Sequence, residues 1–250
     1  MGSDDTKHVL IIGASGGIGN KVAETLLEVG YAVIGTYFQH PEKVENLKKY
    51  PHFSEEQLDL KESESISNIS RKVTSALYAV VNCAGICIFE GENTKNDIDI
   101  WRETIAVNLT GNYMLGKILY KYLTENGRFI MISSTDGYYG GTITASYAAS
   151  KLAVTSLTKS FSLLFKDKKI RVNSIAPGWV LTPMIAGNGE EFLQKVADIN
   201  PLKRNAEPID VANLIKFLLE SDSDYLNGQT ISLEGGYTNQ DPILLIEEKI

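Results

Sequence analysis

Ile11-Ile12-Gly13-Ala14-Ser15-Gly16-Gly17-Ile18-Gly19 joins an apolar run to a helix-like stretch near the start of this 250-residue chain. Its glycines let the backbone turn sharply and approach a pyrophosphate closely. The helix that follows would present unpaired N–H groups and the positive end of its dipole, which attract phosphate. The spacing is Gly-x3-Gly-x-Gly and differs from the general dinucleotide fingerprint. The stretch therefore predicts either a dinucleotide-binding loop or an ordinary strand-to-helix turn.

The rest of the chain alternates strand-like apolar runs with longer amphipathic stretches, which is typical of an α/β fold with a parallel sheet. No repeat or flexible linker divides it, so we expect a single domain over residues 1–250, with a core over 7–237 and a tail over 238–250. The strands are expected near 8–12, 31–36, 53–58, 78–82, 128–133, 170–175 and 229–233, and the helices near 17–29, 63–75, 98–124, 146–166 and 208–220.

Composition excludes several function classes. A net charge of -7 and a pI near 5.1 disfavour a nucleic acid partner. No apolar run approaches the roughly 20 residues that a membrane-spanning helix needs, and the N-terminus lacks the features of a signal peptide, so we expect a cytoplasmic protein. Cys83 and Cys87 match no zinc pattern and are expected to be reduced thiols, so no metal site is predicted.

A hydrolase is the alternative from another class. Gly13-x-Ser15-x-Gly17 has the spacing of a nucleophile elbow between a strand and a helix. Such a serine needs an acid and then a histidine further along the chain. Only His40 and His52 follow it, and no aspartate lies between Ser15 and either of them, so the order of residues argues against a hydrolase.

The end of the second predicted strand bears on the choice of dinucleotide. An acid about 20 residues beyond the glycines would bind the adenosine ribose of NAD. The segment Gly35-Thr36-Tyr37-Phe38-Gln39-His40 contains no acid. This favours NADP, because a carboxylate would repel its 2′-phosphate and Thr36 and Tyr37 can donate hydrogen bonds to it. A strand end of mixed residues is the alternative, and NAD stays possible.

Tyr147 and Lys151 are four residues apart in a predicted helix, so their side chains lie on one face. Tyr113 and Lys117 repeat the spacing, so the pair alone is not diagnostic. Ser134, however, precedes Tyr147 at the end of a predicted strand, at the sheet edge where doubly wound folds bind ligands. We expect Ser134, Tyr147 and Lys151 to converge, and we interpret the other pair as packing and surface.

These three residue types fit the reduction of a carbonyl group. Hydride transfer to carbon places negative charge on oxygen, which requires a proton donor and a hydrogen-bond donor in position. A tyrosine pKa near 10 must fall by about two to three units to work near neutrality. The Lys151 ammonium, aided in the oxidation direction by the oxidised nicotinamide, is expected to lower the pKa of Tyr147.

In this order the motifs resemble the short-chain dehydrogenase/reductase family over about residues 7–237. The glycine loop matches, Asn82-Cys83-Ala84-Gly85 is similar to the family's segment after the fourth strand, and Pro177-Gly178 with Thr182 is similar to its segment near the nicotinamide. The resemblance implies a Rossmann-type, doubly wound parallel sheet of seven strands in the order 3-2-1-4-5-6-7, with helices on both faces.

The resemblance also implies roles for individual residues. Asn108, Ser134, Tyr147 and Lys151 fall on the catalytic tetrad, in which Asn108 holds a proton-relay water with Lys151, and Ser134 binds the substrate oxygen. Lys151 would also bind the nicotinamide ribose. The implied cofactor-binding residues are Gly13, Ser15, Gly16, Gly17, Ile18, Gly19, Thr36, Tyr37, Asp59, Leu60, Asn82, Ala84, Gly85, Tyr147, Lys151, Pro177, Gly178, Val180 and Thr182, with Asp59 and Leu60 at the adenine.

Three positions depart from the family pattern. Ile12 replaces the usual Thr before the first glycine, and Cys83 replaces an Asn. Gly16 stands where many NADP-preferring members carry Arg or Lys. The first two departures affect the geometry of the loops, and the third weakens the prediction of NADP.

The nearest look-alikes are the 3-oxoacyl-[acyl-carrier-protein] reductases, through residues 200–204 and 226–229. Residues 124–126 lack the basic side chains expected to dock an acidic carrier protein. We expect an NADP(H)-dependent enzyme that reduces a 3-oxoacyl-like or other small ketone to a secondary alcohol, or runs the reverse. A catalytically silent, cofactor-binding sensor or scaffold is the alternative.

The resemblance implies a homo-oligomer, a dimer or tetramer, that forms through the helices at 98–124 and 146–166. Residues 182–208 are irregular, with several Gly and Pro residues, and suit a mobile cover over the site.

Overall fold

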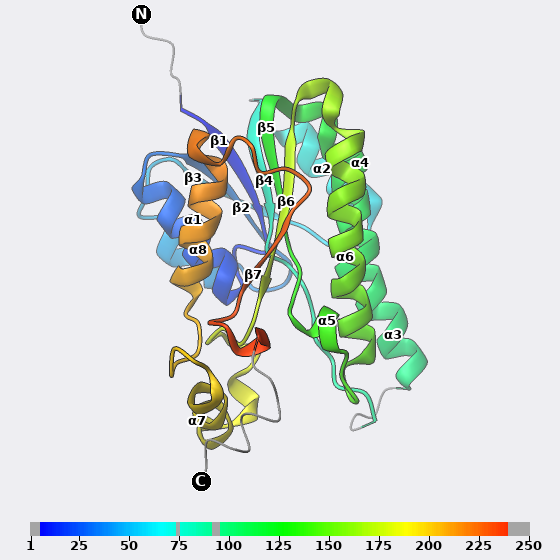
Figure 1. Ribbon diagram of the computed structural model, residues 1–250. Helices are drawn as coiled ribbons and strands as arrows, with labels where there is room; N and C mark the ends of the chain where they lie inside the picture. The colour runs from blue at the N-terminus through cyan, green and yellow to red at the C-terminus, as the bar shows by residue number, and fades with distance from the viewer. Residues whose placement is uncertain (1–5, 74–75, 92–95, 240–250) are drawn as a thin grey trace, which may run out of the picture.

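The protein is described by a computed structural model that covers residues 6–73, 76–91 and 96–239. Within these ranges seven strands form one parallel sheet in the order β3-β2-β1-β4-β5-β6-β7, which confirms the prediction. Helices cover both faces of the sheet (Figure 1). The strands are β1 His8–Ile12, β2 Ala32–Tyr37, β3 Phe53–Gln57, β4 Leu77–Asn82, β5 Leu123–Ile132, β6 Arg171–Pro177 and β7 Thr230–Leu233.

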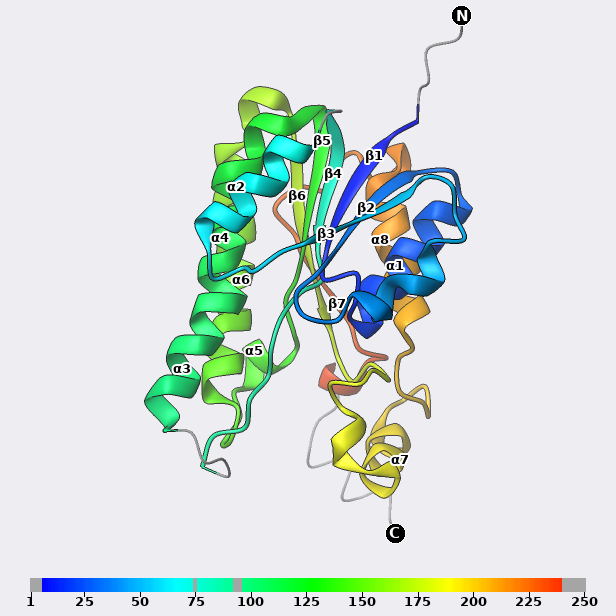
Figure 2. The ribbon, with the colours of Figure 1, turned by 180° about the vertical axis from the view of Figure 1, so that it is seen from behind.

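The central strand β1 is apolar on both faces, as expected for a parallel strand buried between two helical layers. Val9 and Ile11 pack into one core with side chains of α1 (Gly17–Glu28) and α8 (Pro208–Leu219). Leu10 and Ile12 point the other way, into a second core. That core is shared with α2 (Ser63–Lys72), α4 (Gly111–Leu119) and α6 (Ala145–Leu164) (Figures 1 and 2).

The predicted helix over 98–124 is wrong as a single element. The structure has α3 (Asp97–Ile105), a π-helical turn η2 (Ala106–Thr110), α4 and a 3-10 turn η3 (Tyr120–Tyr122), and β5 already begins at Leu123. A π turn displaces backbone carbonyls from their usual helical partners. The side chain of Asn112 binds one of them, the carbonyl of Asn108, at 2.6 Å. Beyond η2 the chain packs tightly, since a Cβ at Gly116 would lie 2.2 Å from the Phe161 ring.

Other differences are smaller. β5 starts before the expected 128, and β6 runs past the expected 175. The helix expected over 63–75 ends at Lys72, and residues 74–75 lie outside the described ranges, as does the predicted tail beyond Asn239. The elements not predicted individually are η1 Pro41–Leu47, α5 Asp136–Tyr139, η4 Lys166–Lys168, η5 Ala186–Asn188, α7 Glu190–Ile199, η6 Ser221–Ser223 and η7 Tyr237–Asn239.

The segment 182–208 holds η5 and α7 at the end of the sheet opposite the N-terminus (Figure 1). Its mobility stays a prediction. In the described ranges, none of the helices combines the length and the apolar character that crossing a bilayer requires.

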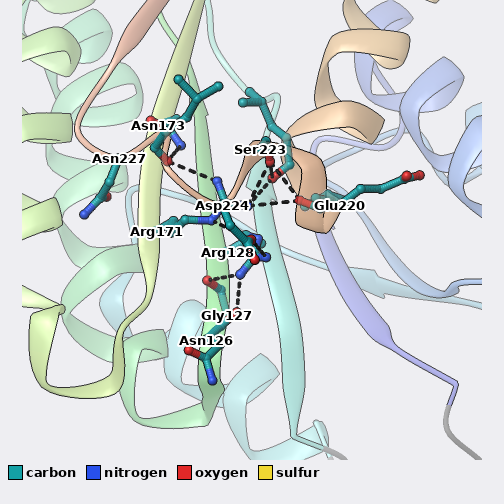
Figure 3. Close-up of polar contacts among 12 residues, drawn as sticks. Asn126, Gly127, Arg128, Arg171, Asn173, Glu220, Ser223, Asp224 and Asn227 are labelled. Carbon is teal, nitrogen blue, oxygen red and sulfur yellow. Dashed lines mark hydrogen bonds and ion pairs between the residues drawn. The ribbon is translucent and has the colours of Figure 1, made fainter.

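Two buried arginines hold the amino end of the sheet together (Figure 3). Arg128 on β5 and Arg171 on β6 are register partners, and each is 6% exposed. Both reach Asp224, at 2.6 Å and 3.5 Å respectively, and Arg171 also donates to the carbonyl of Leu218 and the hydroxyl of Ser223. Burial lowers the pKa of Arg171 to about 10. These bonds tie the connection from α8 to β7 onto the sheet, because buried cations require such partners.

Candidate active site

The glycine loop lies where the carboxyl ends of β1, β2 and β4 meet. Gly13 has a φ of 80°, and a Cβ on it would lie 2.9 Å from the Ala84 backbone. A Cβ on Gly19 would lie 2.1 Å from the Gly13 oxygen. Thr36, at 1% exposure, accepts a hydrogen bond from the Gly13 N–H at 3.0 Å. Thr36 thus supports the loop, a contact that the sequence reasoning did not anticipate.

The amino end of α1 is open toward this edge. Gly16 is its N-cap residue, and within the described part of the chain no side chain caps it and no acid stands in its first turn. Helix termini leave backbone N–H groups unpaired unless a side chain, water or ligand binds them. The end of α1 therefore fits a pyrophosphate, which needs such donors and the positive end of the dipole.

A cleft of about 350 Å³ runs from this loop across the ends of β2 and β4. The residues that line the cleft come from the glycine loop, the end of β2, the turn after β3, the loop after β4 and the segment after β6. The predicted cofactor-binding residues that line it are Gly13, Ser15, Gly16, Gly17, Ile18, Thr36, Tyr37, Asp59, Leu60, Ala84, Gly85 and Thr182.

The remaining predicted cofactor residues do not line this cleft. Asn82 is buried, donates to Asn112 Oδ1 at 2.8 Å and accepts from the Ala84 N–H at 3.0 Å, so it shapes the loop after β4. The Pro177 carbonyl accepts from the N–H of Thr135. Gly178, Val180, Tyr147 and Lys151 are likewise absent from the cleft lining, although Lys151 Nζ reaches the lining residue Gly85, and Gly19 acts through the close packing of the loop.

Two basic residues of the cleft were missed by the sequence reasoning. Lys43, on η1, and Lys61 both line the cleft, as Tyr37 does, and both lysines are exposed. Neither has an ion-pair partner among the described residues. The side chain of Asn20 binds the Lys43 carbonyl at 2.9 Å and the Ala14 carbonyl at 3.3 Å, which fixes η1 against the glycine loop. No motif spacing in the sequence predicts the position of Lys43, because the residue reaches the cleft through the hydrogen bond between its carbonyl and the Asn20 side chain.

Ser134, Tyr147 and Lys151 converge as predicted. The Ser134 hydroxyl lies close enough to the phenol of Tyr147 for a polar interaction that lowers the pKa of the phenol. Lys151 Nζ lies 5.4 Å from the centre of the Tyr147 ring. A Cβ on Gly85 would lie 3.2 Å from Lys151 Nζ and 3.3 Å from Asn108 Oδ1, so the fourth tetrad residue reaches the same glycine of the cleft.

Asn108 is buried and its side chain makes three hydrogen bonds. Its Oδ1 accepts from the Ile86 N–H at 2.8 Å, and its Nδ2 donates to the Ile86 carbonyl at 2.8 Å and to Ser150 Oγ at 3.1 Å. These bonds attach the loop after β4 to α6. The proton-relay water at Asn108 stays a prediction.

Burial controls the protonation of the tyrosine and lysine pair. Lys151 is 3% exposed and donates to the Ile132 carbonyl at 2.9 Å, and burial lowers its pKa to about 8. Burial raises the pKa of Tyr147, and the polar interaction with Ser134 only partly opposes this. The neighbour that lowers the pKa of Tyr147 is Ser134 and not Lys151, and loss of hydration outweighs its effect, so the prediction that Lys151 lowers this pKa is wrong for the protein as described.

The second Tyr and Lys pair behaves as interpreted. Tyr113 is 51% exposed on α4 and its ring stacks on Phe161 at 6.2 Å. Lys117 is exposed. This pair therefore provides a matched control for the pair in the site.

The comparisons with known proteins agree with this geometry. The sequence profile of the family described as enoyl-(acyl carrier protein) reductase matches residues 13–238. The chain is 34% identical to a 3-oxoacyl-[acyl-carrier-protein] reductase of Rickettsia felis, covering 92% of this chain and 96% of that protein. It is 30% identical to a cis-4-hydroxycyclohexanecarboxylate dehydrogenase of Sinomonas cyclohexanicum, covering 95% and 99%. The solved structure of ElxO with NADP bound aligns with a TM-score of 0.84, at 31% identity, covering 94% and 100%.

These matches span nearly the whole chain, and together with the sheet order and the convergent tetrad they define its class. The chain belongs to the short-chain dehydrogenase/reductase family, whose members are oxidoreductases.

Replacing Lys151 with Met tests the burial of its charge. Burying the charged ammonium lowers the free energy of unfolding by its full amount below pH 8, and this penalty disappears as the pH rises to 10.5, the ordinary pKa of lysine. By the pKa shift it is at most about 3 kcal/mol, partly offset by the bond to Ile132. We expect Lys151→Met to melt no lower than wild type at pH 7, and its advantage to shrink between pH 8 and 10.5.

Denaturant unfolding at several pH values measures this difference. Lys117→Met is the control, because it removes an exposed charge at the matched position and should show no such dependence on pH. A marked loss of stability in Lys151→Met at pH 7 would show that the buried ammonium stabilises the fold.

Proposed function

We propose that this chain binds NADP(H) and interconverts a ketone and a secondary alcohol, with Tyr147 as the general acid and base. The observation that carries the proposal is the convergence of Ser134, Tyr147 and Lys151 beside a cleft built on the glycine loop. The fit of the open end of α1 to a pyrophosphate supports it. So do the ketoreductase and dehydrogenase names of the similar proteins and the NADP bound to ElxO.

A bound nicotinamide would supply the hydride for reduction or accept it in oxidation. Burial keeps the Tyr147 phenol protonated, so it can donate its proton to the oxygen of the reduced substrate. The Ser134 hydroxyl, close to that phenol, holds the same oxygen. Lys151, whose Nζ lies 5.4 Å from the centre of the tyrosine ring, would hold the nicotinamide ribose and would return a proton through a water at Asn108.

A silent sensor or scaffold is not favoured, because the similar proteins carry enzyme names and all four tetrad residues are present. The cytoplasmic location also stays a prediction. We propose that the substrate is a small molecule.

Tyr147→Phe tests the assignment of the acid. It should bind NADPH as wild type does and lose at least about 100-fold in turnover, since general acid-base catalysis contributes roughly that much or more. Tyr113→Phe, the matched control, should keep full turnover. Steady-state kinetics on a panel of ketones, with NADPH binding followed by fluorescence, would measure both effects. Near-normal turnover of Tyr147→Phe would refute the role of Tyr147.

We infer a preference for NADP from the charge around the second strand end. Tyr37, Lys43 and Lys61 surround the part of the cleft beyond Thr36, and the strand end carries no acid. The two lysines compensate for Gly16, which lacks the basic side chain of many NADP-binding relatives. Adenine would then lie near Asp59 and Leu60, which line the adjoining wall.

Lys43→Ala tests this preference. Equilibrium titration should show that wild type binds NADPH more tightly than NADH, and that the variant loses roughly 10-fold in NADPH affinity with little change for NADH. Lys48→Ala is the control, because Lys48 pairs with Glu45 and Glu55 outside the cleft. Equal affinity of wild type for the two cofactors would contradict the reading of the strand end.

We also propose that the chain forms a dimer or tetramer through α3, α4 and α6. These helices expose large apolar side chains, among them Trp101 and Leu152 at 44% and 51%. Trp101→Glu with Leu152→Glu should shift the protein to a smaller species in analytical ultracentrifugation. Phe217→Glu, a matched change at an exposed position on α8, should not. A wild-type monomer at micromolar concentration would contradict the proposal.

A further inference from the structure

Asp136 begins α5 and is tied to the proposed substrate site by its backbone. Its N–H donates to Ser134 Oγ at 3.2 Å, and that hydroxyl lies close to the phenol of Tyr147. The Asp136 backbone is therefore in direct contact with one of the two groups proposed to bind the substrate oxygen. The pKa of Tyr147, Cys87 and Tyr237 is raised mainly by burial, and the negative charge of Asp136 adds to each of these shifts.

Residues 237–238 contact the residues on either side of Asp136 in the chain. Thr135 Oγ1 and Tyr237 Oη lie 2.7 Å apart, and Tyr139 donates to the Thr238 carbonyl at 3.3 Å. A Cβ on Gly178 would lie 2.9 Å from the Tyr237 ring, so the ring also contacts the segment after β6. α5 and η7 are thus joined to each other, and Asp136 begins the α5 side of this unit.

The Asp136 carboxylate differs from the other acids around the site in having no partner. Glu90 accepts a hydrogen bond from the Ser146 N–H at 2.8 Å, and Glu234 accepts one from the Thr238 N–H at 3.0 Å. Among the described residues, nothing hydrogen-bonds or forms an ion pair with the Asp136 side chain. Partial burial raises its pKa as well. A half-buried carboxylate without partners is costly, and a ligand that donates hydrogen bonds would relieve that cost.

A structural role in α5 does not account for this acid. An aspartate in the first turn stabilises a helix through the macrodipole, but α5 is a single turn of four residues, and the dipole of so short a helix is small. The Asp136 N–H is already satisfied by Ser134, so the side chain is not needed to cap it.

We propose, on the basis of the proposed function, that Asp136 selects the substrate: it accepts a hydrogen bond from a second hydroxyl group and excludes anionic ketones. The preferred substrates are then neutral diols or polyols and the matching hydroxyketones. Carboxylates and acidic thioesters meet repulsion from Asp136, with Glu90 and Glu234 nearby. This separates the chain from the relative named for 4-hydroxycyclohexanecarboxylate, which is an anion.

Three six-membered ketones of matched shape test the proposal: 2-hydroxycyclohexanone, cyclohexanone and 4-oxocyclohexanecarboxylate, each with NADPH. Wild type should show a kcat/KM for the hydroxyketone at least about 10-fold above that for cyclohexanone, and lowest for the anion. Asp136→Ala should lose about 10-fold on the hydroxyketone, change little on cyclohexanone, and gain on the anion. The isosteric Asp136→Asn should gain on the anion too and keep part of the hydroxyketone preference.

Asp167→Asn is the control, since it removes one exposed negative charge on η4 and should alter none of the three values. A wild-type preference for the anion overturns the proposal. So does an equal loss of all three activities in both Asp136 variants, which would indicate that Asp136 only positions Ser134.

A binding measurement separates this proposal from the proposed function. With NADP⁺ present, trans-cyclohexane-1,2-diol should raise the melting temperature of wild type more than cyclohexanol does, and Asp136→Ala should lose that difference. Diol-specific stabilisation without reduction of any ketone would contradict the proposed function and support Asp136. Turnover without any diol or hydroxyketone preference would overturn Asp136 and leave the proposed function standing.

Discussion

The close approach of three strand ends governs the rest of the site. Gly13 packs so tightly on Ala84 that a Cβ could not fit between β1 and β4, and the Thr36 hydroxyl at the end of β2 holds the Gly13 N–H. Parallel strands deliver all their carboxyl ends to one edge of the sheet. The glycines leave this edge of the sheet open as a cleft. The residues that follow β5 and those that begin α6 lie beside the cleft.

Buried charged groups have many partners at the amino end of the sheet and few at the carboxyl end. At the amino end, Arg128 and Arg171 are surrounded by backbone carbonyls and share Asp224, so their burial holds the structure together (Figure 3). At the carboxyl end, the Lys151 ammonium donates a hydrogen bond to the Ile132 carbonyl, and the Asp136 carboxylate has no partner among the described residues. Charges with so few partners reduce stability, which is the usual sign of groups retained for binding or catalysis.

The glycine loop and the convergence of Ser134, Tyr147 and Lys151 could be predicted from the sequence, because each depends on local patterns placed at the ends of strands. The sheet order and the place of Asn108 followed from the resemblance to the family. The π turn could not be predicted, since it depends on how the Asn112 side chain meets a backbone carbonyl. Lys43 and Asp136 reach the site through contacts made by their backbones, with Asn20 and Ser134 respectively. No sequence spacing encodes such contacts. The mobility of residues 182–208 and the single-domain organisation stay predictions.

Burial shifts the pKa values of Tyr147 and Lys151, the two ends of the proposed proton path, in opposite directions. It disfavours the charged form of each group, so it holds the proton on the Tyr147 phenol and loosens it from the Lys151 ammonium. For the proposed chemistry this arrangement suits reduction, in which the phenol donates. Oxidation needs the phenolate, and so it needs further positive charge beside Tyr147 beyond what Lys151 provides. Asp136 opposes that requirement, because its repulsion also favours the protonated phenol until a substrate hydroxyl or a proton neutralises part of its charge.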